Sequence, residues 1–84
     1  MVVYVFERIN VYDGFEDTTI RVYADLEKAT QILKEQIEMV KEEFEECDYD
    51  AENYVEGDMS WTIWEEGEFC MNHVSLTIYE REVE

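Results

Sequence analysis

The 84-residue sequence contains no proline, three glycines, two cysteines and six basic residues. Because no proline-rich linker divides the chain, we expect a single domain over residues 1–84. The first apolar run, residues 1–6, is too short for a secretory signal, and no basic residue precedes it. Without such a signal, Cys47 and Cys70 predict reduced thiols and a cytoplasmic protein. No apolar stretch approaches the length of a membrane span, so no membrane partner is expected.

Basic residues are scarce beside 23 Asp and Glu, and the formal net charge is −17. A field of this sign repels nucleic acid and attracts basic surfaces, so we expect no direct nucleic-acid binding. Hydrophobic residues nevertheless make up 46% of the chain and aromatic residues 14%, which is too much for a disordered acidic tail. The sequence therefore predicts a folded, strongly acidic protein.

Two runs rich in β-branched and aromatic residues, 2–12 and 18–24, flank an Asp-Gly pair. An Asp-Gly pair between such runs is typical of a two-residue hairpin turn, because both turn positions need a positive φ. A turn of this length places Tyr12 opposite Phe15. Residues 59–65 and 73–83 alternate in the same way and predict a second pair of strands.

Residues 25–46 indicate one long amphipathic helix that begins after Asp25, a suitable N-cap. Its apolar positions recur at steps of three and four residues: Leu26, Ala29, Leu33, Ile37, Val40 and Phe44. Residues 47–58 indicate a loop. The predicted fold class is α+β with a ββαββ order, in which the helix packs on one face of a four-stranded antiparallel sheet.

Strand alternation also predicts which side chains face the helix. From the first hairpin we expect these to be Val3, Val5, Ile9, Val11, Ile20, Val22 and Ala24. The opposite face then carries all three arginines, Arg8, Arg21 and Arg81, and five aromatic residues, Tyr4, Phe6, Tyr23, Trp64 and Tyr79. Aromatic residues and arginine are enriched where proteins bind each other. This aromatic face is therefore a predicted surface for a homodimer or a partner, or else an ordinary half-exposed sheet.

The negative charge is concentrated in residues 42–58, which hold nine acids and no base: Glu42, Glu43, Glu45, Glu46, Asp48, Asp50, Glu52, Glu56 and Asp58. Four of these glutamates occupy the last turns of the predicted helix, where the macrodipole disfavours anions. Two interpretations remain open. The acids form either a solvated face that keeps the protein soluble, or a carboxylate row that takes the place of phosphates on a basic protein surface.

Sequence patterns for chemistry are weak. Cys47, Cys70 and His73 are three soft ligands, whereas a structural zinc site wants four. Residues 48–52 resemble the start of a calcium loop, but Met59 stands where that loop needs its bidentate glutamate. We therefore predict no catalytic residue, no metal site and no cofactor, and expect a protein that is not an enzyme.

The run of residues 66–78 (EGEFCMNHVSLTI), with the N-terminal hairpin and the acidic helix, resembles small uncharacterised acidic α+β proteins of bacterial and phage genomes. That resemblance covers most of the chain and implies no known activity. In size and charge alone, the chain is similar to phage inhibitors that mimic DNA, such as anti-CRISPR proteins. None of their motifs matches residue by residue, so no functional residue is carried over.

The sequence thus predicts a non-enzymatic acidic interaction protein that binds a basic partner, such as a nucleic-acid-binding protein. In this interpretation it acts as a phage or mobile-element inhibitor that mimics nucleic-acid charge. The alternative is a small cytoplasmic domain that associates through the aromatic face, as a homodimer or with a partner.

Overall fold

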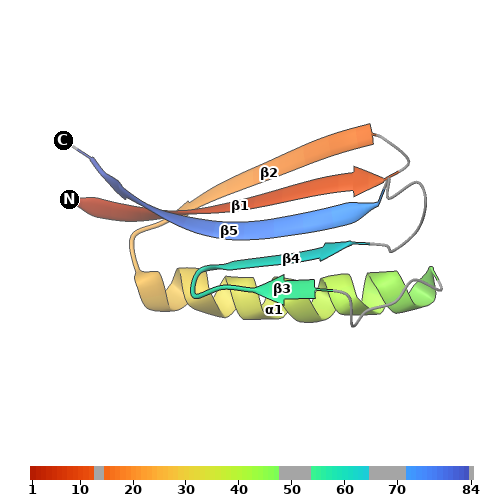
Figure 1. Cartoon of the computed structure of the whole chain (residues 1–84). Coiled ribbons are helices and arrows are strands. Elements are labelled where there is room, and N and C mark those ends of the chain that lie inside the picture. Colours follow the sequence, from red (N-terminus) through yellow and green to blue (C-terminus); the bar gives the residue numbers. More distant parts are fainter. Residues whose placement is uncertain (13–14, 48–53, 65–71, 84) are drawn as a thin grey trace.

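The computed structural model describes residues 1–12, 15–47, 54–64 and 72–83. Five strands and one helix follow in the order β1 (Val2–Tyr12), β2 (Phe15–Tyr23), α1 (Leu26–Glu46), β3 (Tyr54–Glu56), β4 (Ser60–Trp64) and β5 (His73–Glu82). The strands form one antiparallel sheet in the order β2-β1-β5-β4-β3, and α1 lies along one of its faces (Figure 1). The predicted α+β class is confirmed.

The first hairpin has the predicted register. Tyr12 lies opposite Phe15 and Tyr4 lies opposite Tyr23, as a two-residue turn requires. The turn residues 13–14 lie outside the described residues. The second strand begins at Phe15 rather than at residue 18, because pairing continues up to the turn.

The prediction of four strands was wrong, because a short fifth strand lies within the predicted loop 47–58. Tyr54–Glu56 pairs with β4, and Glu56 lies opposite Trp61. The Gly57 amide donates a hydrogen bond of 2.8 Å to the Ser60 carbonyl, which closes the tight connection between β3 and β4. This strand is too short to show an alternating pattern in the sequence.

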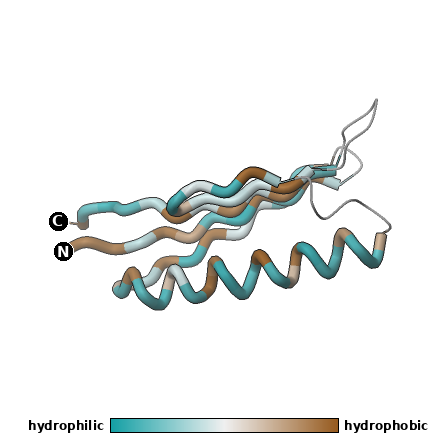
Figure 2. Tube along the Cα trace, turned by 60° about the horizontal axis from the view of Figure 1, so that its bottom comes forward, coloured by the Kyte–Doolittle hydropathy of each residue, from teal (hydrophilic) through white to brown (hydrophobic). Residues whose placement is uncertain are grey.

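Helix α1 begins and ends where the sequence predicts. The Asp25 carboxylate accepts a hydrogen bond of 2.9 Å from the Glu27 amide and so satisfies one of the first free N–H groups. Hydrophobic positions recur along the helix among hydrophilic ones (Figure 2). The core is formed by Ala29, Leu33, Val40 and Phe44 from the helix and by Phe6, Trp61, Ile63, Val74, Leu76 and Ile78 from the sheet.

The predicted faces of β1 and β2 were wrong. Phe6 lies opposite Ile78 and Arg8 lies opposite Leu76, and residues that lie opposite each other point to the same side of a sheet. The buried side of β5 therefore determines that the even-numbered residues of β1 face the helix. Together with their partners on β2, the residues on this side include Tyr4, Phe6, Arg8, Arg21 and Tyr23.

The open face of the sheet consequently carries the aliphatic side chains that were expected in the core. These are Val3, Val5, Ile9, Val11, Ile20 and Val22. Arg81, Tyr79 and Trp64 lie on this face as predicted. Ala24 is exposed beyond the end of β2.

Candidate functional site

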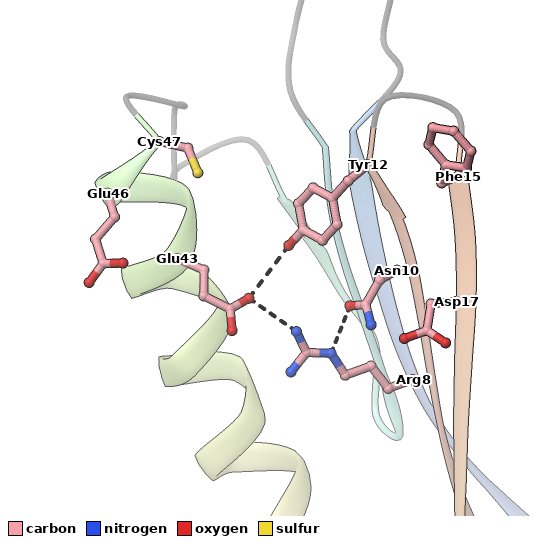
Figure 3. A pocket seen from close by; sticks show the side chains of 8 residues that line it. All are labelled: Arg8, Asn10, Tyr12, Phe15, Asp17, Glu43, Glu46 and Cys47. Atoms are coloured by element: carbon pink, nitrogen blue, oxygen red, sulfur yellow. Dashed lines mark hydrogen bonds and ion pairs between the residues drawn. The ribbon is translucent and has the colours of Figure 1, made fainter.

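A cleft of about 530 Å³ opens between the C-terminal half of α1 and the end of the β1–β2 hairpin (Figure 3). It exists because the helix covers the centre of the sheet, whereas β2 is exposed from Phe15 to Val22. The lining side chains are Arg8, Asn10, Tyr12, Phe15, Asp17, Glu43, Glu46 and Cys47.

Arg8 lines this cleft and links β1 to the helix through hydrogen bonds. Its Nε donates to Asn10 Oδ1 at 2.7 Å, its Nη1 to Gln36 Oε1 at 2.6 Å and its Nη2 to Glu43 Oε2 at 3.0 Å. The side chain is only 15% exposed, and the Glu43 carboxylate compensates its charge. Arg8 therefore has a structural role, and the other charged residues that line the cleft are acidic.

Tyr12 joins the same network through its hydroxyl group, which donates to Glu43 Oε2 at 3.5 Å. Burial raises the pKa of the Tyr12 phenol above its ordinary value of 10.0, and the nearby Glu43 carboxylate raises it further. Both effects disfavour a second negative charge beside the helix end. The phenol is therefore a neutral hydrogen-bond donor over the range in which proteins normally work.

This raised pKa predicts how stability depends on pH. Because the folded protein holds the Tyr12 proton more tightly than the unfolded chain, the contribution is fully present below the ordinary pKa of 10.0 and is lost as pH rises through the folded-state value. We expect the free energy of unfolding to fall as pH rises above the ordinary value of 10.0, and to fall less in the Tyr12→Phe variant. Urea unfolding at neutral pH and at a series of pH values above 10.0 measures the difference, and equal declines would contradict the prediction.

Three of the predicted acidic residues stand exposed at the end of α1. Glu42, Glu45 and Glu46 are exposed, and the last turn of the helix contains no basic residue. Within the described ranges, ion pairs engage only Glu43, with Arg8, and Glu38, with Lys41. Glu46 lines the cleft, so the exposed carboxylates continue from the helix end into its rim.

The other predicted acids do not join this patch. Glu43 is half-buried against Arg8. Glu56 is exposed on β3 and lines a separate hollow with Lys34 and Lys41, and Asp58 is exposed in the turn that follows. Asp48, Asp50 and Glu52 lie outside the described residues. The structure thus separates the sequence cluster into a helix-end group and a β3 group.

The five predicted aromatic residues do not share one surface. Phe6 is 2% exposed, and Tyr4 and Tyr23 pack against the core beneath the helix. Only Trp64 and Tyr79 of this set lie on the open face. Sequence reasoning instead missed Phe15 and Tyr12 as lining residues of the cleft.

Among the residues that the structure describes, no three His, Cys, Asp or Glu side chains are grouped to hold a metal ion. Cys47 is exposed at the C-cap and His73 is half-buried on β5, while Cys70 lies outside the described residues. No helix in the same part of the chain has the length and apolar character needed to cross a membrane.

The β2 side of the cleft offers a carboxylate and an aromatic ring to a basic side chain. Asp17 and Phe15 both lie on β2, and Phe15 is 81% exposed, whereas the Glu46 carboxylate lies on the helix and points away from them (Figure 3). A guanidinium or ammonium group can pair with a carboxylate and lie over an aromatic face.

No protein-family model, curated protein or solved structure matches the chain.

Proposed function

We propose that this protein is a non-enzymatic interaction protein that binds a basic protein surface through the C-terminal end of α1 and the adjoining cleft. The observation that carries the proposal is the exposure of Glu42, Glu45 and Glu46 at a helix end whose last turn has no basic residue. We infer further that the partner's surface is one that otherwise binds nucleic-acid phosphates, so that this protein acts as a charge-mimicking inhibitor.

The energetics of the helix end support a use outside the fold. An exposed anion near a helix C-terminus costs about 0.3–1 kcal/mol before screening by salt. Glu42 and Glu46 are also like charges one turn apart, which costs a few tenths of a kcal/mol more. A basic partner surface would offset these repulsions by its own attraction to the same carboxylates.

The cleft supplies the specific part of the proposed contact. An arginine or lysine of the partner would pair with Asp17, with its aliphatic stem against Phe15. Arg8 would not repel it strongly, because Glu43 already compensates the Arg8 charge at 3.0 Å. The helix-end carboxylates then steer the encounter, and the cleft determines the register of docking.

The triple variant Glu42→Gln, Glu45→Gln and Glu46→Gln tests this function. We expect its affinity for a basic partner to fall about tenfold at low salt, because each glutamine keeps the shape and removes one charge. Its helix should be more stable, by about 1 kcal/mol in the free energy of unfolding. Capture of binding proteins from a host lysate, followed by a titration of the captured protein, measures the affinity.

A matched control carries Glu35→Gln, Glu80→Gln and Glu82→Gln. These residues are exposed and lie away from the helix end, and this triple changes the net charge by the same amount. It should retain the partner. Equal losses in the two triples would reduce the effect to net charge, whereas unchanged affinity in the first triple would overturn the proposed site. Release of the captured protein by double-stranded DNA is the expected sign of phosphate mimicry.

Association through the predicted aromatic sheet face is less favoured, because Phe6 is in the core and Tyr4 and Tyr23 pack against it. The cytoplasmic location stays a prediction from the cysteines and the N-terminal sequence.

A further inference from the structure

The outer edge of β2 is unprotected. This strand is at one end of the sheet, has nine residues in continuous register with β1, and contains no proline. Its residues from Phe15 to Val22 are all exposed. Edge strands are usually short, bulged, covered or interrupted, because a free row of N–H and C=O groups pairs with another strand. A long, exposed edge strand of this kind can pair with a strand of another chain.

The hydrogen-bond pattern shows which groups of β2 are free. The Val83 amide donates to the Met1 carbonyl at 2.7 Å, and the Met1 amino group donates back to the Val83 carbonyl at 3.3 Å. The odd-numbered residues of β1 therefore bond to β5, and its even-numbered residues bond to β2. On β2, the backbone groups of Glu16, Thr18, Ile20 and Val22 consequently point away from the sheet.

We propose that two copies of this chain pair antiparallel along β2, about a two-fold axis at Thr19, to form a continuous ten-stranded sheet. In this register Thr18 lies opposite Ile20 of the second copy, so the outward-pointing backbone groups of both chains meet. Asp17 lies opposite Arg21 of the second copy, twice by symmetry, and Phe15 lies opposite Tyr23. Unlike the proposed function, this inference rests on the edge strand alone.

The strand sequence distinguishes this register from its neighbours. Backbone pairing also allows an axis at Thr18 or at Ile20. An axis at Thr18 places Phe15 against Arg21 and Asp17 against Thr19, and an axis at Ile20 places Asp17 against Tyr23. Only the axis at Thr19 places Asp17 of one copy opposite Arg21 of the other, and these are the two charged residues on the helix side of β2. Opposite charges and aromatic pairs at facing positions are the favourable cross-strand combinations.

An antiparallel dimer also separates the negative charge of the two copies. The acidic end of α1 lies beside the start of β2, where Phe15 and Glu46 line the same cleft. Pairing about Thr19 sends the two acidic ends to opposite ends of the strand pair, about 27 Å apart at the usual rise of a strand. This exceeds the Debye length of about 8 Å at physiological salt. We therefore expect added salt to strengthen the dimer, by screening the net charge of −17 on each copy.

A charge exchange tests the register. At about 0.5 M NaCl, where the Debye length is about 4 Å, the wild-type protein should sediment as a dimer. Asp17→Arg alone and Arg21→Asp alone place like charges opposite each other, and each variant should be about threefold weaker as a dimer, because salt also screens these exposed charges. An equal mixture of the two variants restores both pairs, and should form a heterodimer as tight as the wild type. Both positions are exposed, so both variants should fold.

Amide hydrogen exchange identifies the edge itself. The amides of Thr18 and Ile20 should exchange fast in the monomer and slowly in the dimer, whereas those of Thr19 and Arg21 are protected in both. A wild-type monomer at every salt concentration would overturn the proposal. Dimers unaffected by both single variants, or variants that fail to rescue each other, would overturn the register. Asp17 also lines the cleft of the partner site, whereas Arg21 does not, so loss of the dimer in Arg21→Asp with partner binding retained distinguishes this inference from the proposed function.

Discussion

Replacement of Trp61 by alanine should lower the free energy of unfolding by about 3–5 kcal/mol. Trp61 is 1% exposed and lies on the helix side of the short strand β4, with its ring centroid 5.5 Å from that of Tyr54. Truncation removes the largest side chain of the core and leaves a cavity. A domain of 84 residues has a total stability of about 4–13 kcal/mol, so this loss is a large share of the whole.

Trp64→Ala is the matched control for this prediction. The same residue type stands three positions later on the same strand, on the open face and half-buried. It should cost clearly less, because solvent can fill the space that the ring leaves. Urea unfolding followed by circular dichroism compares the variants without relying on tryptophan emission. Similar losses for the two variants would contradict the assignment of faces.

The second large effect is expected for Arg8→Met, at about 2 kcal/mol in the free energy of unfolding. Methionine retains most of the apolar stem but leaves Glu43, Gln36 and Asn10 without the donor that they share. Hydrogen bonds to charged groups are worth more than neutral ones, and the Arg8 side chain is largely shielded from water. Half of the cost at Glu43 should be recovered by hydration, since that carboxylate is 43% exposed.

Arg21→Met provides the comparison, measured in dilute solution at low salt, where the proposed dimer is weakest. Arg21 lies on the same side of the sheet but is exposed, so its replacement should change stability by less than about 0.5 kcal/mol. A double-mutant cycle between Arg8→Met and Glu43→Gln isolates the contact that joins β1 to α1. A coupling energy near zero would show that this contact does not hold the helix end in place.

The parts of the fold that depend on local sequence were predictable. The Asp-Gly pair set the register between Tyr12 and Phe15, and Asp25 marked the start of the helix. Hydrophobic periodicity alone was enough to predict the buried face of the helix and the buried side of β5. These features involve neighbours in sequence, so turn chemistry and periodicity are sufficient to predict them.

The faces of the first hairpin were not predictable in the same way, because both sides of β1 are apolar. Val3 and Val5 alternate with Tyr4 and Phe6, and either set satisfies a strand pattern. The choice depends on the pairing of Phe6 with Ile78, a contact between the two ends of the chain. No local signal carries that register.

The candidate site was predictable only in its acidic half. Charge counting identifies Glu42, Glu45 and Glu46 without any knowledge of the fold. The cleft forms where the helix end lies beside the hairpin, and the Arg8–Glu43 contact there joins residues far apart in the sequence. Phe15 and Asp17 could therefore not be recognised as rim residues from the sequence.

The pairing of β1 with β5 at the centre of the sheet has a consequence for biosynthesis. On the ribosome, β1, β2 and the helix emerge long before β5, the strand that supplies Val74, Leu76 and Ile78 to the core. Until then Phe6 lacks its neighbour on that side. Assembly of the core is therefore non-local, and we expect it to be slower than in helical domains of the same size. Until β5 has emerged, the apolar side chains of β1 and the helix lack most of the surface that buries them.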